Sequence, residues 1–336
     1  MIEREKKVLV VRPGPIGNTL AVVPALRALR MWWVDARISA LVEKIGRETL
    51  LGCPYIDEFI VYEKRGEHNG ALGWLKIVRE LRKRKFTHVI LSKRFFRMSF
   101  IARFTGAPVR VGFAGYGHKL TVEVTWHPYR SVIDTNLDLV EALGIPPAGR
   151  HLEIWRTAED EAQVKKFLEE KGIAGHPFKV AIHAGGITRK NVLLPPSHWA
   201  EIALALEEHY GALPIFVGGR GDLEVIDEIT RASGKEYINA VGLNIRATAY
   251  LISQCRFFMG NDSGPSHLAQ AVNTPGIIYY GRAEDWEANI KRWKPEGESW
   301  IAVAPADDGS HPAPRKFMLE VSELIHRISE REKIGK

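Results

Sequence analysis

The chain has 336 residues, of which 45% are hydrophobic and 26% charged, a composition typical of an ordinary soluble globular protein. No apolar run reaches membrane-spanning length, and the first residues lack a signal-peptide core. We therefore expect neither a membrane-spanning nor a secreted protein. The two cysteines, Cys53 and Cys255, are far apart, so we expect buried thiols rather than a disulfide or a metal pair. The length favours two domains.

Charge is distributed unevenly along the chain. Residues 1–150 contain 25 Lys and Arg against 14 Asp and Glu, whereas the remainder contains 22 against 26. The basic half would attract an anionic partner, and nucleic acid, an anionic membrane surface and an anionic sugar acceptor all satisfy this condition. A solvated basic helix face explains the charge equally well. No recognised nucleic-acid motif accompanies the basic run, which argues against the first of these partners.

Short Val- and Leu-rich runs alternate with amphipathic runs through the first 143 residues. We expect strands at 7–12, 37–42, 59–62, 87–91 and 109–113, and helices at 20–30, 45–51, 71–84, 96–104 and 131–143. Residues 13–18 are predicted to form a turn. This alternation indicates a parallel sheet covered by helices on both faces. The segment Pro146–Arg150 is the best candidate for an interdomain linker.

The alternation then starts again. We expect strands at 179–183, 214–217, 256–259 and 276–280, and helices at 159–170, 199–210, 223–231, 247–253, 268–272 and 315–331. The last helix follows an irregular Pro-containing stretch. The fold class predicted is therefore α/β, with two Rossmann-like, doubly wound parallel-sheet domains of similar size and no sequence repeat between them.

One motif lies between a buried strand and a helix in the second half. It is Gly260-Asn261-Asp262-Ser263-Gly264-Pro265-Ser266-His267. Asp262 and Ser263 are good N-cap residues, and Pro265 suits a first helical turn. A strand, a Gly-rich turn and a helix present backbone N–H groups and a helix N-terminus to phosphate. A capped helix without a ligand is an equally good interpretation.

Two further loops leave predicted strand ends in the second half, where open α/β sheets bind ligands. The first, His183-Ala184-Gly185-Gly186-Ile187-Thr188-Arg189-Lys190, combines glycines that let backbone approach a ligand with donors on Thr188, Arg189 and Lys190. The second, Gly218-Gly219-Arg220-Gly221-Asp222, supplies an acid that could accept hydrogen bonds from ribose hydroxyls. Asp222 could equally be the N-cap of the next helix. Together with the motif at 260–267, these loops suggest a nucleoside-diphosphate site.

These residues together resemble the ADP-heptose–lipopolysaccharide heptosyltransferases, glycosyltransferase family 9 of the GT-B fold. The resemblance covers nearly the whole chain and rests on residues 11–27, His183–Gly186, Pro195–Trp199, Gly218-Gly219, residues 260–269, Pro275 and Tyr280-Gly281. It implies two domains facing across a cleft. The first, residues 1–150, would bind the acceptor and be joined by the C-terminal helix at 315–336, while residues 151–314 would bind the nucleotide sugar.

The resemblance also implies roles for single residues. In the family, an Asp-Ser/Thr-Gly-x-x-His motif holds the donor diphosphate, a role that would fall here on Asp262, Ser263, Gly264 and His267. Thr188 with Arg189 or Lys190 would contact phosphate, although Asn191 stands near where a Lys is usual, and Asp222 would bind ribose. Donor contacts are expected to include Gly185, Gly186, Gly218, Gly219, Pro265 and Ser266. No metal ion or other cofactor is expected, because basic groups and a helix N-terminus can stabilise the leaving diphosphate.

One departure from the family pattern concerns the end of the first loop. Family members usually carry an Ile-Gly-Asp sequence whose Asp looks like the base for the acceptor hydroxyl, whereas this chain has Ile16-Gly17-Asn18. A neutral amide cannot take a proton, although it can orient a hydroxyl. Asn18, Asp262 and His267 are the candidate catalytic residues, and Arg12, Gly17 and Lys93 are candidates for acceptor binding.

The resemblance implies an inverting glycosyltransferase that moves a sugar, expected to be a heptose from ADP-heptose, to the lipopolysaccharide inner core or a related anionic glycolipid. We expect it to act as a monomer in the cytoplasm, in peripheral contact with the inner membrane leaflet. The alternative, motivated by Asn18, is a catalytically weak or inactive sugar-nucleotide-binding homologue.

Overall fold

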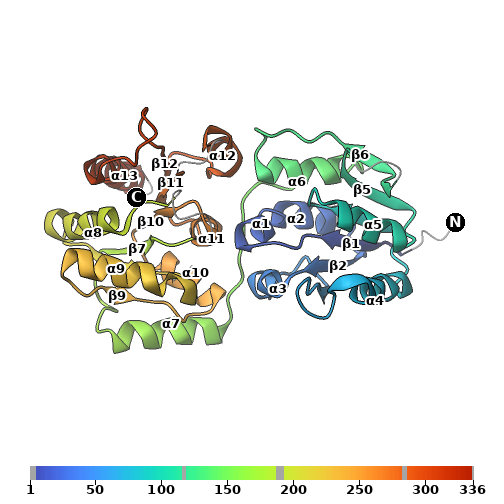
Figure 1. Cartoon of the computed structure of the whole chain (residues 1–336), viewed down its shortest axis with the longest axis horizontal. Coiled ribbons are helices and arrows are strands. Elements are labelled where there is room, and N and C mark those ends of the chain that lie inside the picture. Colours follow the sequence, from blue (N-terminus) through green and yellow to red (C-terminus); the bar gives the residue numbers. More distant parts are fainter. Residues whose placement is uncertain (1–4, 116–118, 187–192, 282–285, 335–336) are drawn as a thin grey trace. The chain divides into compact units, whose positions relative to one another are not determined.

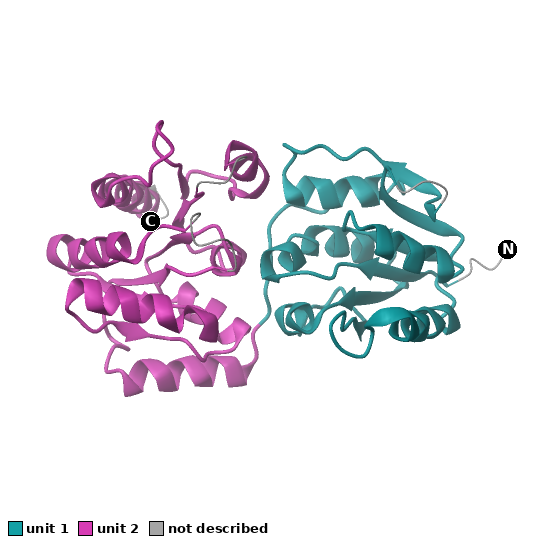
Figure 2. Ribbon diagram, in the orientation of Figure 1, with its two compact units in different colours: residues 1–155 teal, residues 156–336 magenta. Residues whose placement is uncertain are grey.

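A computed structural model describes residues 5–115, 119–186, 193–281 and 286–334 of the chain. It contains two compact units, Met1–Trp155 and Arg156–Lys336 (Figure 2). The division falls five residues beyond the boundary expected at 150. Each unit is an α/β layer structure with its own parallel sheet (Figure 1).

The first unit is built on a six-stranded sheet in the order β3-β2-β1-β4-β5-β6, and all of its strand pairs are parallel. The strands are β1 Lys7–Val11, β2 Arg37–Val42, β3 Glu58–Val61, β4 His88–Leu91, β5 Val109–Phe113 and β6 Val122–Val124. The strand β1 pairs with β2 on one side and β4 on the other. The carboxyl ends of β1 and β4 are therefore the topological switch point of this sheet, where open α/β sheets bind ligands.

The helices of the first unit are α1 Ile16–Leu20, α2 Val23–Trp32, α3 Lys44–Leu50, α4 Gly70–Lys83, α5 Phe96–Phe104 and α6 Val132–Glu141. A turn was expected at 13–18 and a helix at 20–30; α1 instead begins inside the expected turn, and α2 covers most of the expected helix. Pro24 occupies the first turn of α2, where a missing N–H costs nothing, so the chain begins a new helix there. The apolar faces of α4 and α5 pack on the sheet in one core that includes Leu9, Ile77 and Ile101.

The second unit repeats the same topology, with sheet order β12-β11-β10-β7-β8-β9. Its strands are β7 Lys179–His183, β8 Leu213–Phe216, β9 Ile238–Asn239, β10 Phe257–Asn261, β11 Gly276–Tyr279 and β12 Trp300–Val303. Here β7 takes the place that β1 has in the first unit, and β10 that of β4. The switch point thus lies at the carboxyl ends of β7 and β10, from which two of the three expected donor loops leave.

The helices of the second unit are α7 Ala158–Glu170, α8 Pro196–Tyr210, α9 Leu223–Ser233, α10 Ile245–Ser253, α11 Gly264–Ala271, α12 Trp286–Trp293 and α13 Pro314–Ile334. A short 3₁₀ helix covers Arg220–Asp222. The sequence pattern missed β6, β9, α12 and β12. These elements are short: the three strands have two to four residues and α12 has eight.

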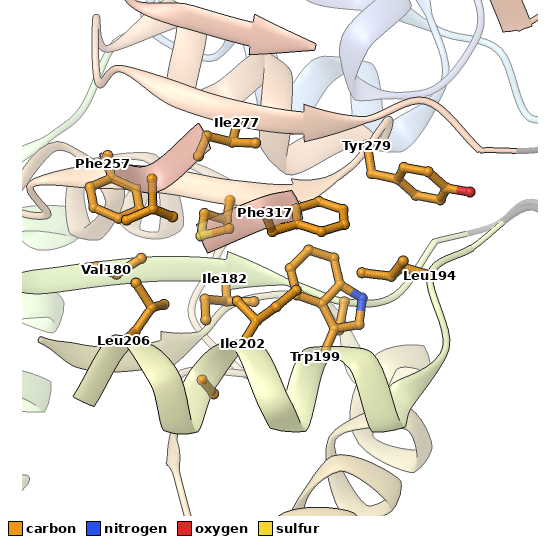
Figure 3. Packing of buried hydrophobic residues seen from close by; sticks show 14 of the residues in the cluster. Val180, Ile182, Leu194, Trp199, Ile202, Leu206, Phe257, Ile277, Tyr279 and Phe317 are labelled. Atoms are coloured by element: carbon orange, nitrogen blue, oxygen red, sulfur yellow. The ribbon is translucent and has the colours of Figure 1, made fainter. Parts of the chain in front are cut away.

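The last helix, α13, packs in the second unit. Phe317, Val321 and Leu324 form one buried stripe at helical spacing and join the core around Trp199, whose ring centroid lies 6.0 Å from that of Phe317 (Figure 3). Farther along the helix, Glu332 forms an ion pair with Arg256 of the same unit. The expected transfer of residues 315–336 to the first domain is therefore not observed, because the apolar stripe of α13 is buried against α8 and the sheet of the second unit.

Candidate functional site

The motif at 260–267 forms the expected strand, turn and helix. β10 continues through Gly260 and Asn261, two residues beyond the predicted strand end, and α11 begins at Gly264. Ser263 is the N-cap in extended conformation, and its capping partner Ser266 donates from Oγ to the Ser263 carbonyl at 2.7 Å. Pro265 stands in the first turn. A helix start leaves backbone N–H groups without intrahelical acceptors, which is the arrangement that binds phosphate. In this turn the Ser266 N–H donates to the Ser263 carbonyl oxygen at 3.2 Å.

Asn261 ties the motif to the loop after β7. Its Nδ2 donates to the carbonyl oxygens of Ala184 at 2.7 Å and Gly185 at 3.3 Å, and its Oδ1 accepts from the Leu194 N–H at 3.2 Å. Sequence analysis did not select Asn261 as a site residue. Its buried side chain joins the loop after β7 to the loop after β10, so Asn261 is a positioning residue of the site.

His183 bridges two of the three predicted loops. Its Nδ1 lies 2.8 Å from Ser263 Oγ, and its Nε2 lies 3.4 Å from Asp222 Oδ2. Because a carboxylate only accepts hydrogen bonds, Nε2 carries the proton toward Asp222. Ser263 Oγ is also 3.0 Å from the Asn261 carbonyl oxygen. In the sequence, His183 is visible only as part of a loop and of a family motif. Its position at the end of β7 was the available signal.

The carboxylate of Asp222 occupies space that glycines leave open. A Cβ added at Gly185 would lie 1.8 Å from Asp222 Oδ1, and one at Gly218 would lie 2.4 Å from Oδ2. The N–H of Gly219 donates to Oδ2 at 2.7 Å. Burial alone would raise the pKa of Asp222, but the hydrogen bond and charge of His183 and the N–H groups of Gly219 and Gly186 outweigh it and lower the pKa.

This arrangement changes the interpretation of the glycines and of Asp222. Gly185 and Gly218 admit an internal carboxylate, rather than only admitting the approach of a ligand. Asp222 is the N-cap residue of α9 by position, as the alternative interpretation held, but its side chain makes no capping hydrogen bond to that helix. The side chain instead joins the start of its own loop, at Gly219, to His183.

Two candidate catalytic residues of the motif have pKa values that burial has shifted in opposite directions. Burial raises the pKa of Asp262 to about 6 and lowers the pKa of His267 to about 4. The ring of His267 lies 5.2 Å from that of Trp293 on α12. His267 is therefore neutral at pH 7 and offers a hydrogen bond rather than a positive charge. Asp262 lies near enough to Tyr280 that its charge, after burial, raises the pKa of that phenol.

The basic part of the loop after β7 cannot be placed. Thr188, Arg189 and Lys190 lie outside the described residues, whereas Gly186 is the last described residue before them. Their expected phosphate contacts remain predictions.

A second set of candidate residues meets at the switch point of the first unit. Arg12 follows β1, and its Nε and Nη2 donate to the backbone oxygen of Asn18, at 2.8 Å, and to the Asn18 side-chain oxygen. Its Nη1 donates to Ser92 O at 2.8 Å, and Lys93 Nζ donates to Pro13 O at 3.1 Å. Burial, followed by the charge of Arg12, lowers the pKa of Lys93. Gly17 is buried inside α1 next to Asn18.

The cysteines are buried and free, as predicted. Burial raises the pKa of the Cys53 and Cys255 thiols to about 12, so neither is a nucleophile at neutral pH. In the described part of the chain, no three His, Cys, Asp or Glu side chains are grouped as metal ligands. No helix among the described residues is long and apolar enough to cross a membrane.

A model of glycosyltransferase family 9 (heptosyltransferase) matches residues 74–306, more than half of the chain. The chain belongs to glycosyltransferase family 9. It is 22% identical to the lipopolysaccharide core heptosyltransferase OpsX of Haemophilus influenzae, over 83% of this chain and 80% of that protein. The family assignment confirms the resemblance drawn from the motifs and identifies the chain as a glycosyltransferase.

Solved family 9 structures share the fold. The structure of a family 9 glycosyltransferase from Veillonella parvula matches with a TM-score of 0.84 at 21% identity and covers 97% of this chain and 99% of its own. Escherichia coli ADP-heptose lps heptosyltransferase II matches with a TM-score of 0.77 at 19% identity, with the same coverage. The predicted GT-B class, with two Rossmann-like units, is therefore confirmed.

Proposed function

We propose that this family 9 glycosyltransferase is an inverting heptosyltransferase, which transfers a heptose from ADP-heptose to the inner core of lipopolysaccharide or to a related anionic glycolipid. The observation that carries the proposal is the capped N-terminus of α11 at the switch point of the second unit, beside His183 and Asp222. The solved Escherichia coli relative is named for the donor ADP-heptose, and OpsX for the lipopolysaccharide core.

The donor would bind at the second unit. Its diphosphate would contact the backbone at residues 263–266, where the Gly264 N–H is a donor, Pro265 has none, and the helix dipole favours negative charge. The Asp222 carboxylate is held ionised by His183 and backbone N–H groups, as is required to accept hydrogen bonds from ribose hydroxyls. Neutral His267 would donate or accept one hydrogen bond. The leaving diphosphate is stabilised by these fixed dipoles, and we propose that no metal ion takes part.

The acceptor would bind at the switch point of the first unit. Arg12 and Lys93 supply fixed positive charge there, and Asn18 lies against the Arg12 guanidinium. A phosphate- or carboxylate-bearing glycolipid is the acceptor class that this charge favours. In a single displacement the acceptor hydroxyl oxygen attacks the anomeric carbon, the bond to the diphosphate oxygen breaks, and the configuration inverts. The hydroxyl proton must leave, and Asn18 cannot take it.

The alternative function is a sugar-nucleotide-binding homologue that has weak transferase activity or none. Asn18 is the specific observation in its favour, because general-base assistance is typically worth ~10²–10⁴-fold in rate. Such a protein would still bind the donor, since the donor residues lie in the other unit.

Calorimetry with ADP, UDP and GDP tests the donor, and mass spectrometry of a lipid A acceptor bearing acidic core sugars, incubated with ADP-heptose, tests the transfer. We expect ADP to bind most tightly and the acceptor to gain the mass of one heptose, with the rate unchanged by EDTA. Binding of ADP without any product would favour the alternative. Failure to bind any nucleoside diphosphate would overturn both.

We further propose that the enzyme works as a cytoplasmic monomer in peripheral contact with the inner membrane leaflet. The acceptor lipid would be anchored in that leaflet, so a soluble enzyme must reach it there.

A further inference from the structure

Two neighbouring helices of the first unit expose large apolar side chains to solvent. On α4, Leu72 is 84% exposed and Leu75 is 38% exposed. On α5, the exposed fractions are 59% for Phe96 and 41% for Phe104. Phe95, immediately before α5, is exposed as well. Neither helix needs these side chains for its own packing, since its opposite face supplies Ile77, Leu81, Met98 and Ile101 to the core. Clustered exposed apolar side chains indicate an interaction site.

The exposed side chains form one surface rather than two separate stripes. The helices pack against each other. The Trp74 ring of α4 meets the Phe104 ring of α5 edge-on with centroids 5.3 Å apart, and the rings of Phe96 and Phe100, one turn apart, also meet edge-on at 4.8 Å. We call the outer face of Gly70–Lys83 and residues 95–104 the α4–α5 surface.

The α4–α5 surface is strongly basic. Helix α4 carries Lys76, Arg79, Arg82 and Lys83, and helix α5 carries Arg97 and Arg103. Across both helices the only acid is Glu80, which forms an ion pair with Arg84 at 2.8 Å. Two of the cations have partners in the segment before α4: Lys76 forms an ion pair with Glu67, and Arg97 donates to the His68 backbone oxygen at 3.2 Å. At the other end of the surface, the Lys119 ammonium lies 4.8 Å from the Phe96 ring centroid and 4.4 Å from that of Phe100.

Cations resting on exposed aromatic rings, beside exposed leucines, are the pattern of a protein surface at a membrane interface. Aromatic and aliphatic groups enter the boundary between headgroups and acyl chains, while Lys and Arg stay in the headgroup layer and contact lipid phosphates. Nucleic acid would satisfy the cations but would leave Leu72 and Phe104 without an apolar partner. Charge and apolar exposure together therefore favour an anionic bilayer.

We propose that the α4–α5 surface docks on the surface of an anionic lipid bilayer, with Leu72, Phe96 and Phe104 inserted and the exposed cations Arg79, Arg82, Lys83 and Arg103 facing lipid phosphates. This deepens the peripheral membrane contact proposed above but requires neither donor nor acceptor. Lys93 at the acceptor switch point and Phe96 on the docking surface are three residues apart at the end of β4. Docking would therefore hold the acceptor residues close to the lipid surface.

Vesicle flotation of the full chain tests the proposal, using phosphatidylglycerol–phosphatidylcholine vesicles that contain no sugar acceptor. Wild type is expected to float with these vesicles, to float less as salt rises, and to stay unbound with pure phosphatidylcholine. Leu72→Ser/Phe96→Ser/Phe104→Ser should weaken binding by about tenfold or more. Arg79→Gln/Arg82→Gln/Arg103→Gln should weaken it by roughly fivefold per charge at low salt.

The matched control is Met31→Ser/Trp32→Ser, which removes two similarly exposed apolar side chains near the end of α2 and should bind like wild type. Leu72→Asp, at the most exposed position, serves as the variant least able to disturb folding, and it should also weaken binding. The proposal is overturned if the wild-type protein does not bind anionic vesicles or binds neutral vesicles equally well. It is also overturned if the α4–α5 variants weaken vesicle binding no more than the control variant does. It is also overturned if RNA binding or self-association, rather than vesicle binding, is what those variants abolish. Because the vesicles hold no acceptor, failure here leaves the transfer reaction unaffected, and failure of transfer leaves docking unaffected.

Discussion

His183 Nδ1 lies 2.8 Å from the Oγ of Ser263, so the end of β7 is hydrogen-bonded to the N-cap residue of α11. The other ring nitrogen of the same imidazole faces Asp222 at 3.4 Å. His183 thus connects Ser263, where the proposed phosphate site begins, with Asp222, which is proposed to bind ribose. We interpret His183 as a positioning residue, since it acts through Ser263 and Asp222.

Replacing His183 with Ala should weaken ADP binding and lower stability by about 1–3 kcal/mol, because the half-buried carboxylate of Asp222 loses its imidazole hydrogen-bond partner. Asp222 has a lowered pKa, so its hydrogen bonds contribute stability above its ordinary pKa of 3.8, and this contribution is lost as pH falls through the lower folded value. In His183→Ala, stability should therefore depend less on pH in the acid range. Chemical denaturation between pH 3 and 7 (roughly the span of carboxylate titration) measures this. If the free energy of unfolding of His183→Ala depended on acidic pH as strongly as that of the wild type, the assigned link between His183 and Asp222 would be contradicted.

Gly185→Ala should destabilise the second unit by about 1–3 kcal/mol and weaken ADP binding, because the new Cβ collides with the Asp222 carboxylate. The matched control is Gly221→Ala in the loop that carries Asp222, where an added Cβ meets nothing within 4 Å. Thermal unfolding and calorimetry with ADP should separate the two variants. Equal effects of both substitutions would mean that the glycines matter only for loop flexibility.

Asp262→Asn should stabilise the protein at pH 8 while lowering transferase activity. The pKa of Asp262 is raised to about 6, so the folded state binds a proton more tightly than the unfolded chain does. The resulting destabilisation is fully present above pH 6 and disappears as pH falls below the ordinary value of 3.8. The increase in the free energy of unfolding of Asp262→Asn should be largest at high pH, up to about 3 kcal/mol. Denaturation at pH 8 and pH 4 is the measurement, and a variant that is less stable at pH 8 would contradict the burial of a charge.

The exchange Asn18→Asp should keep the fold, because the two side chains are nearly isosteric and Arg12 already donates to this position. If Asn18 limits the chemistry, transfer should rise at pH 7, within the ~10²–10⁴-fold that a general base supplies. The guanidinium of Arg12 would hold the new carboxyl pKa below its ordinary value of about 3.9, so the gain should persist into mildly acidic pH. Asn18→Ala is the control for orientation alone. A lower rate in Asn18→Asp would mean that the amide positions the acceptor and that another group takes the proton.

Local sequence patterns predicted most of the elements correctly. β5 and α5 begin and end at the predicted residues, since their apolar periods are bounded by clear turn residues. The capped start of α11 was also predictable, because Ser263 and Pro265 act within a few residues of their own positions. The family resemblance rested on the same short segments and was confirmed.

Other features depend on contacts between distant residues. The short strand β12 has only four residues, and parallel pairing with β11 places it in the sheet. The stripe of Phe317, Val321 and Leu324 in α13 indicates that one face of the helix is buried, but it does not indicate against which sheet.

The sequence by itself determined two doubly wound units, the helix N-terminus at Ser263 and the family to which the chain belongs, because each depends on residues close together in the chain. Only the tertiary structure decided that His183 joins Asp222 to Ser263, that Gly185 and Gly218 make room for a carboxylate, and that burial neutralises His267. Parallel pairing of β7 with β8 and β10 brings the carboxyl ends of three strands to one edge of the sheet. Burial at that edge shifts the pKa of His267. Neither effect is visible in the spacing of the residues.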